Sequence, residues 1–174
     1  MEMQKDETYY TVLDIIQNYF IEYLTNKNRQ DFVADERAYV IIKDMCNRII
    51  KRDIELLMKD VKYDNLEDKI PKIVNDTIGD KITWGRIASV IAFGAYSTNI
   101  FKKEGKDDLV DNMPDTITGL ILDICRDWMV EQDCWNGFYN SILLKEKFGY
   151  IISCTRIAAF VITSLAIANL FIKI

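Results

Sequence analysis

The sequence contains no histidine among its 174 residues. Histidine is the most frequent general base of enzymes that work near neutral pH, and it is a common zinc ligand. No two of the four cysteines form a CxxC pair, and no serine or cysteine has a histidine to activate it as a nucleophile. We therefore expect free thiols in a reducing compartment, no cofactor or metal site, and a protein that is not an enzyme.

Proline and glycine are also scarce, with two and seven residues respectively. Chains with so few turn-forming residues rarely fold as strands in a meander. Apolar residues instead recur every three or four positions along much of the chain, which is the spacing of one face of a helix. These patterns predict an all-α protein of seven or eight helices, and the length is sufficient for one domain with its own core.

A net charge of −5 makes the chain acidic. An acidic surface is repelled by phosphate backbones, so we expect no binding to nucleic acid. The N-terminal segment is polar and acidic, and it lacks the charged and then apolar pattern of a secretory signal. We therefore expect the chain to be made and kept in the cytosol unless its C-terminal tail inserts into a membrane.

Helical periodicity defines the first part of the chain. The spacing predicts an amphipathic helix over residues 7–25 and a second helical pattern over residues 35–59, which is either one helix or two short ones. A shorter helix is expected over residues 69–78, with Asp68 as its cap and Pro71 in its first turn. Gly79 then marks its end.

Residues 82–101 are apolar or small on nearly every side. A helix that is apolar all round belongs at the centre of a protein, so we expect the other helices to surround this one. A solvated loop is expected over residues 102–108, and the next helix is expected to begin near residues 112–115 with Pro114 in its first turn. Gly137 is expected to separate two further short helices.

The tail is the most apolar part of the chain, and residues 157–172 carry no charge. At helical rise this block is about 24 Å long, which is shorter than the usual membrane span. Arg156 and Lys173 flank it and can reach towards a membrane interface. We predict a helical domain at residues 1–147 and a membrane anchor at residues 148–174, with a last core helix as the alternative for the tail.

Two short motifs stand out from this background. The first is Trp84-Gly85-Arg86-Ile87, where a glycine and an arginine open an otherwise apolar helix. Either Gly85 only eases packing while Arg86 points to water, or the pair admits a partner helix and binds its acidic residue. The second motif runs over residues 128–138, with two tryptophans that we expect on one helical face as core anchors.

In this order, the two motifs resemble the first and second homology motifs of the Bcl-2 family of apoptosis regulators. The first family motif reads Asn-Trp-Gly-Arg-Ile-Val after Asp-Gly; here Asp80 is kept, whereas Lys81 and Thr83 replace the glycine and the asparagine. The second reads Trp-Ile-x-x-x-Gly-Gly-Trp-x-x-Phe, and here Asp133 and Cys134 replace the glycine pair. Trp84, Trp128, Trp135 and Phe138 occupy the aromatic positions of the two motifs.

The resemblance implies a Bcl-2-like bundle around the central helix, with a C-terminal hydrophobic tail helix. It also implies that the BH3 helix of a pro-apoptotic Bcl-2 protein, an amphipathic helix with one Asp, binds in a surface groove. Arg86 is then expected to pair with that Asp, and Gly85 to let the ligand backbone come close. Alignment to the family also places these residues on the groove: Ile49, Ile73, Thr77, Ser89, Val90 and Phe93.

The third family motif, Leu-x-x-x-Gly-Asp, is degenerate here, because its best match at residues 42–47 has Cys46 and Asn47 in place of the glycine and the acid. This loss favours an inhibitor of apoptosis on the mitochondrial outer membrane over a killer protein. The isoleucine-rich composition is similar to that of diverged poxviral members and favours a viral origin. A viral protein of the same fold that binds signalling adaptors and dampens inflammatory signalling is the alternative, and a plain membrane-associated structural protein is a further rival. The sequence leaves open which death proteins bind and whether the chain forms homodimers.

Overall fold

The computed structural model describes residues 5–26, 35–58 and 65–147. Throughout these residues the regular structure is helical, as the sequence predicts. The predicted tail anchor at residues 148–174 lies outside the described residues. Among the described helices, none has both the length and the apolarity needed to cross a bilayer.

The first helix, α1 (Glu7–Thr25), has the bounds that the periodicity predicts. Asp6 caps its start, because the Asp6 carboxylate accepts a hydrogen bond of 3.0 Å from the backbone N–H of Tyr9. Asn26 ends it in the left-handed region, with φ 53°. The apolar stripe of α1 is buried in the core.

The second helical pattern forms one continuous run of three segments. α2 (Glu36–Ile49) leads directly into a π-helical turn, η1 (Ile50–Ile54), and then into α3 (Glu55–Met58). Asp35 caps α2 by accepting from the backbone N–H groups of Arg37 and Ala38. In η1 the backbone N–H of Glu55 donates to the carbonyl of Ile50, five residues back, which is the wide hydrogen bond of a π-helix.

Two predicted helix starts were wrong, and in both cases a proline expected in the first turn lies inside the helix. α4 (Leu66–Ile78) begins three residues before the predicted start, so Pro71 lies inside the helix and Asp68 does not cap it. α6 (Asp107–Glu131) likewise begins at Asp107, so Pro114 is interior. A proline inside a helix removes one backbone hydrogen bond, and at both positions the surrounding packing outweighs that loss.

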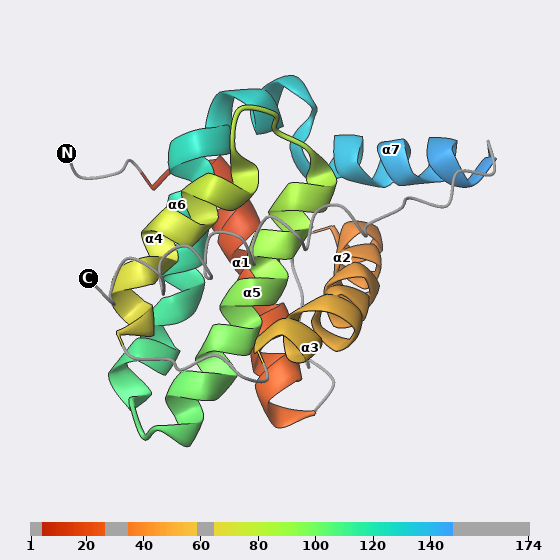
Figure 1. Cartoon of the computed structure of the whole chain (residues 1–174). Helices are drawn as coiled ribbons and strands as arrows, with labels where there is room; N and C mark the ends of the chain where they lie inside the picture. The colour runs from red at the N-terminus through yellow and green to blue at the C-terminus, as the bar shows by residue number, and fades with distance from the viewer. Residues whose placement is uncertain (1–4, 27–34, 59–64, 148–174) are drawn as a thin grey trace.

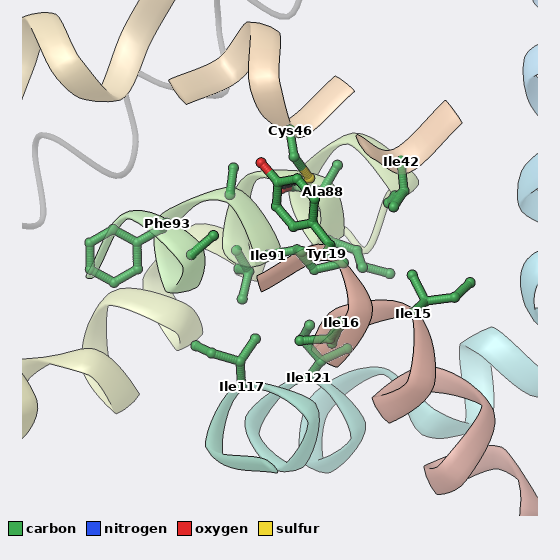
Figure 2. Close-up of a cluster of buried hydrophobic side chains, with 14 of the residues drawn as sticks. Ile15, Ile16, Tyr19, Ile42, Cys46, Ala88, Ile91, Phe93, Ile117 and Ile121 are labelled. Carbon is green, nitrogen blue, oxygen red and sulfur yellow. Dashed lines mark hydrogen bonds between the residues drawn. The ribbon is translucent and has the colours of Figure 1, made fainter. Parts of the chain in front are cut away.

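The central helix is α5 (Trp84–Lys103), and fourteen of its twenty residues are buried. It lies against α1, α2, α4 and α6. Figure 1 shows α5 in the middle of the molecule, with α4 and α6 on one side and α2 and α3 on the other. The residues labelled in the close-up come from α1, α2, α5 and α6 and meet in one apolar cluster (Figure 2).

Close helix approach at α5 depends on Gly94. A Cβ atom there would lie 2.7 Å from Cγ1 of Ile117 in α6 and 2.8 Å from Cζ of Phe20 in α1. The absence of a side chain at this position therefore lets the central helix sit between its two neighbours. The last described helix, α7 (Cys134–Lys147), starts after the end of α6, packs against α2 and projects beyond it (Figure 1).

Candidate functional site

The six groove residues that alignment predicts come from α5 and from two helices that pack against it, α2 and α4. Ile49 ends α2, Ile73 and Thr77 lie on α4, and the remaining three lie on α5. All six are buried, with at most 5% of their surface exposed: Ile49, Ile73, Thr77, Ser89, Val90 and Phe93. A ligand helix that binds here must therefore replace the contacts that now cover these side chains.

Two of these six residues carry hydroxyl groups, and each is satisfied within its own helix. Thr77 donates to the carbonyl of Ile73 at 2.6 Å, and Ser89 donates to the carbonyl of Gly85 at 3.0 Å. Neither hydroxyl is left as a buried donor without a partner, which would cost about 1–3 kcal/mol. Because both hydroxyls are bonded to backbone carbonyls, Thr77 and Ser89 present mainly their carbon atoms to neighbouring side chains.

Gly85 and Arg86 occupy the first turn of α5, and both are half-buried. Thr83 caps this turn, because its hydroxyl accepts from the backbone N–H of Arg86 at 3.3 Å. The first turn of α5 therefore lies at the edge of the buried region, while Ser89, Val90 and Phe93 lie inside it.

The guanidinium group of Arg86 reaches back to α4. Its Nη1 atom donates to the carbonyl oxygen of Ile78, the last residue of that helix. A cation at the C-terminus of a helix also interacts favourably with the helix dipole. Arg86 thus holds the corner between α4 and α5, a contact that the sequence did not reveal.

The aromatic residues of the second motif pack around Trp84, the first residue of α5. Its ring centroid lies 4.8 Å from that of Trp128, 5.9 Å from that of Trp135 and 5.5 Å from that of Phe138. Trp135 is only 2% exposed, and its Nε1 donates to the carbonyl of Thr11 at 3.3 Å. The two homology motifs therefore build one aromatic cluster that fixes the start of α5 to α6 and α7.

The prediction that both tryptophans lie on one helical face was wrong. Trp128 belongs to α6 and Trp135 to α7, and the chain turns between them at Gln132 and Asp133. Both are packed in or against the core, as expected, although Trp128 is only partly buried. A turn, rather than helical spacing, brings them together.

The turn between α6 and α7 contains two non-glycine residues with positive φ, Asp133 at 59° and Cys134 at 45°. These are the two positions at which the resembling motif has glycine. Gly137 lies inside α7 and does not separate two helices as predicted. A Cβ atom at Gly137 would lie 1.5 Å from the carbonyl oxygen of Gln132, so the turn itself requires a glycine there.

Polar contacts and buried side chains hold α2 in place. The Tyr39 hydroxyl donates to Glu22 of α1 at 2.6 Å, and the Tyr19 hydroxyl donates to Asn47 at 3.0 Å. Cys46 of α2 is fully buried, and its thiol donates to the carbonyl of Ala88 at 3.4 Å. The degenerate third motif therefore faces the core of its own chain.

The three cysteines within the described residues are free thiols, as expected. Burial raises the pKa of Cys46 and raises the pKa of Cys125 to about 11. Burial also raises the pKa of Cys134, with Asp133 and Asp6 as further causes. These side chains are therefore protonated near neutral pH and act as small apolar groups.

A family model described as apoptosis regulator proteins of the Bcl-2 family matches residues 40–135. An apoptosis regulator Bcl-2 homolog of canarypox virus is 52% identical over 171 residues, covering 98% of each chain. A protein of the same name from fowlpox virus (strain NVSL) is 36% identical over 172 residues, covering 94% of this chain and 92% of its own.

The crystal structure of the FPV039:Bik BH3 complex is also similar to this chain. The TM-score is 0.64 at 38% sequence identity, and the match covers 78% of this chain and 99% of that one.

Proposed function

Because the chain belongs to the Bcl-2 family of apoptosis regulators, we propose that it inhibits apoptosis by sequestering the BH3 helices of pro-apoptotic family members. The observation that carries this proposal is the similar solved structure, which is a complex with the Bik BH3 segment. The poxviral relatives agree with the predicted viral origin. Sequestered BH3 helices are unable to promote permeabilisation of the mitochondrial outer membrane.

The groove proposed for the ligand lies between α2 and α4, with α5 as its floor. Four of its residues are wholly apolar, namely Ile49, Ile73, Val90 and Phe93, and the hydroxyls of Thr77 and Ser89 bond within their own helices. An amphipathic helix binds such a surface through residues at i, i+3 or i+4, and i+7. Each large apolar side chain that it buries contributes about 1.5–3 kcal/mol.

In this proposal, Arg86 binds the Asp of the ligand helix. A guanidinium carries five N–H donors in a planar fork, a geometry that suits two-bond recognition of a carboxylate. Arg86 is half-buried, and partial desolvation strengthens an ion pair relative to a fully exposed one. Gly85, one residue earlier, lets the ligand backbone come close.

The proposal is tested with full-length protein and the Bik BH3 peptide, together with a peptide whose Asp is changed to Ala. We expect Arg86→Ala to weaken binding of the unmodified peptide by about 1–3 kcal/mol, or roughly five- to 150-fold. The two changes together should cost no more than either alone, because both remove one interaction. Additive losses, or a variant that binds like wild type, would contradict the role of Arg86.

We also propose that residues 148–174 anchor the protein to the mitochondrial outer membrane, with the helical domain facing the cytosol. The proposal is supported by the uncharged block at residues 157–172 and its two flanking cations. A fluorescent reporter fused to residues 145–174 is expected on mitochondria in cell imaging and fractionation. A reporter spread through the cytosol would instead make the tail part of the helical domain.

A further inference from the structure

Helix α1 carries a second apolar stripe besides the one in the core, and this second stripe faces outward. Its members are Tyr10, Leu13, Ile21 and Leu24. At 3.6 residues per turn they fall within about 80° of the helix circumference and extend over about 21 Å of its length. Tyr10 is 57% exposed and Ile21 is 50% exposed, whereas Leu13 and Leu24 are half-buried. We call these four residues the outer stripe of α1.

The outer stripe differs from an isolated exposed apolar side chain. Single exposed apolar residues are ordinary on a soluble protein, whereas a contiguous apolar patch marks an interaction site. Val40 on α2 is isolated, although it is 59% exposed. The residues three and four positions before and after it are all charged: Glu36, Arg37, Lys43 and Asp44. The outer stripe instead continues along about four turns of one helix, which is a length that a partner helix can follow.

Carboxylates lie beside the outer stripe. Glu7 is exposed and lies one turn before Tyr10 on the same side of α1. On α6, which packs against α1, Asp123 is exposed and lies one turn before Arg126. The Arg126 guanidinium bonds to Asp6 at 2.6 Å, so this side of α6 borders the start of α1.

The cations near the start of α1 are paired with other carboxylates. Lys5 bonds to Asp115 at 3.1 Å, and Arg126 bonds to Asp6 at 2.6 Å. The helix α1 itself contains no lysine and no arginine. The charge beside the outer stripe is therefore negative, and it favours a partner with positive charge.

We propose that the outer stripe of α1 is a second interaction surface and that its occupant is a basic amphipathic helix of a partner protein. Such a helix places apolar residues at i, i+3 or i+4, and i+7 against the stripe, and its lysines or arginines against Glu7 and Asp123. A second copy of this chain fits less well, because two α1 helices would bring together acidic segments that carry no cation. The surface is separate from the predicted BH3 groove, whose residues lie on α2, α4 and α5. Because the stripe is small, we expect reversible binding with a Kd on the order of 10 µM.

The experiment titrates the full-length protein with two short helical peptides that have the same leucine pattern on one face. One peptide has lysine at its other positions, and the second has glutamate there. Wild type should bind the leucine–lysine peptide at least about tenfold more tightly than the leucine–glutamate peptide. Equal affinities, or no saturable binding of the leucine–lysine peptide, would overturn the inference.

Ile21→Asn tests the stripe without changing any charge. It should weaken binding of the leucine–lysine peptide at least about fivefold, while affinity for the Bik BH3 peptide stays within about twofold of wild type. Val40→Asn makes the same kind of change at the isolated exposed residue of α2, and it should bind the leucine–lysine peptide like wild type. Equal losses in the two variants, or undiminished binding to Ile21→Asn, would show that general attraction to an acidic protein causes the binding.

Asp123→Asn tests the charge beside the stripe. It should weaken binding of the leucine–lysine peptide by about two- to fivefold at low ionic strength, and the difference should shrink as salt is added. The exposed Asp68 on α4 is the control, and Asp68→Asn should bind like wild type. A loss in Asp68→Asn as large as that in Asp123→Asn would mean that net charge alone attracts the peptide, which contradicts the inference.

Two further measurements on wild type locate the peptide and the competing occupant. A leucine–lysine peptide that carries a photoreactive leucine should crosslink to residues 10–24 or to α6, and crosslinks confined to α2, α4 and α5 would place it in the BH3 groove and overturn the inference. In sedimentation experiments, self-association that Ile21→Asn abolishes would assign the outer stripe to a second copy of this chain and would also overturn it. We expect crosslinks on α1 and no self-association that depends on Ile21.

Discussion

At the scale of single residues, the junction between α6 and α7 is held by a glycine and an indole ring. Gly137 lies so close to the carbonyl of Gln132 that no side chain fits, and Trp135 fills the space beside Trp84 and Phe138. Both residues act on the same turn, the glycine through its backbone and the tryptophan through its packing.

Gly137→Ala is expected to lower the free energy of unfolding by about 3 kcal/mol, at the upper end of what forced packing costs. The new Cβ would meet a backbone oxygen that has no side-chain freedom to move away. Urea denaturation monitored by circular dichroism would measure the loss. The exposed Asn140 on the same helix is the control, and Asn140→Ala should change stability by less than about 0.5 kcal/mol.

Trp135→Ala should cost about 3–5 kcal/mol, because it removes a large side chain that is 2% exposed and its hydrogen bond to Thr11. Trp128→Ala should cost clearly less, since that ring is only partly buried. Thermal melting of the two variants checks the order. Equal melting temperatures would mean that burial does not set the difference.

Several residue-level features could be predicted from the sequence, and others could not. The burial of Val90 and Phe93 follows from an apolar helix placed at the centre. The positive φ of Asp133 and Cys134 was not predicted, although glycine, which the resembling motif has at both positions, adopts that backbone region readily. The contact between Arg86 and the end of α4 depends on how two helices meet, which periodicity does not encode.

At the scale of helices, two kinds of contact hold the bundle together. α5 packs closely against α1 and α6 at Gly94. The start of α1 is bound to α6 by ionic contacts. The N-terminal end of α1 is tied to α6 by two carboxylates. Asp6 binds Arg126 at 2.6 Å, and Asp115 accepts from the Tyr9 hydroxyl at 2.6 Å and from Lys5 at 3.1 Å. We call these contacts the α1–α6 clasp.

Gly94→Ala is expected to lower the free energy of unfolding by about 1–3 kcal/mol, because the new methyl would push α5 away from both Ile117 and Phe20. The double variant Gly94→Ala/Ile117→Val removes one methyl group from the α6 side chain that the new Cβ atom would meet. If packing is the cause, the second change should restore part of the loss. An equal or larger loss in the double variant would contradict that cause.

The α1–α6 clasp predicts a loss of stability in acid. The backbone N–H of Tyr9 and then Arg126 lower the pKa of Asp6, and the Tyr9 hydroxyl and then Lys5 lower the pKa of Asp115. Each folded-state pKa lies below the ordinary value of 3.8, so the stabilisation is present above that value and is lost as the pH falls through the lower one.

Denaturation from about pH 5 to about pH 2 should therefore show a smaller loss of stability in Asp115→Asn than in wild type, because Asn does not titrate. The exposed Asp111 on the same helix is the control, and Asp111→Asn should follow the wild-type curve. Identical curves for Asp115→Asn and wild type would show that the clasp does not contribute to acid stability.

The helix boundaries show how far apolar periodicity and proline positions predict the elements of this fold. The bounds of α1 were predicted correctly from its apolar stripe, and the structure adds Asp6 as the cap at its start. The starts of α4 and α6 were placed too late, because prolines commonly mark a first turn and here lie inside the helices. The π-helical turn after α2 has no sequence signature at all.

At the scale of the whole molecule, the predicted groove combines Phe93 of the buried helix α5 with Ile49 of α2 and Ile73 of α4, two helices that pack against α5. The all-α bundle and its central helix were predictable from apolar periodicity, and the family was predictable from two short motifs in the right order. Which partners bind most tightly depends on side-chain packing in the groove, which neither motif determines.

The central claim is that a BH3 helix binds over α5 between α2 and α4. Its most direct test is a titration of the full-length protein with the Bik BH3 peptide, for wild type and for Ser89→Tyr. Ser89 is a small, 2% exposed residue of the predicted groove floor, so a tyrosine there should occupy the ligand's space. Ser141→Tyr on α7 makes the same change at a half-buried serine of another helix and serves as the control.

We predict saturable one-to-one binding to wild type and to Ser141→Tyr with a Kd below about 1 µM. Ser89→Tyr should bind at least about tenfold more weakly while its helical circular-dichroism signal is unchanged. The absence of saturable binding to wild type, or undiminished binding to a folded Ser89→Tyr variant, would contradict the account.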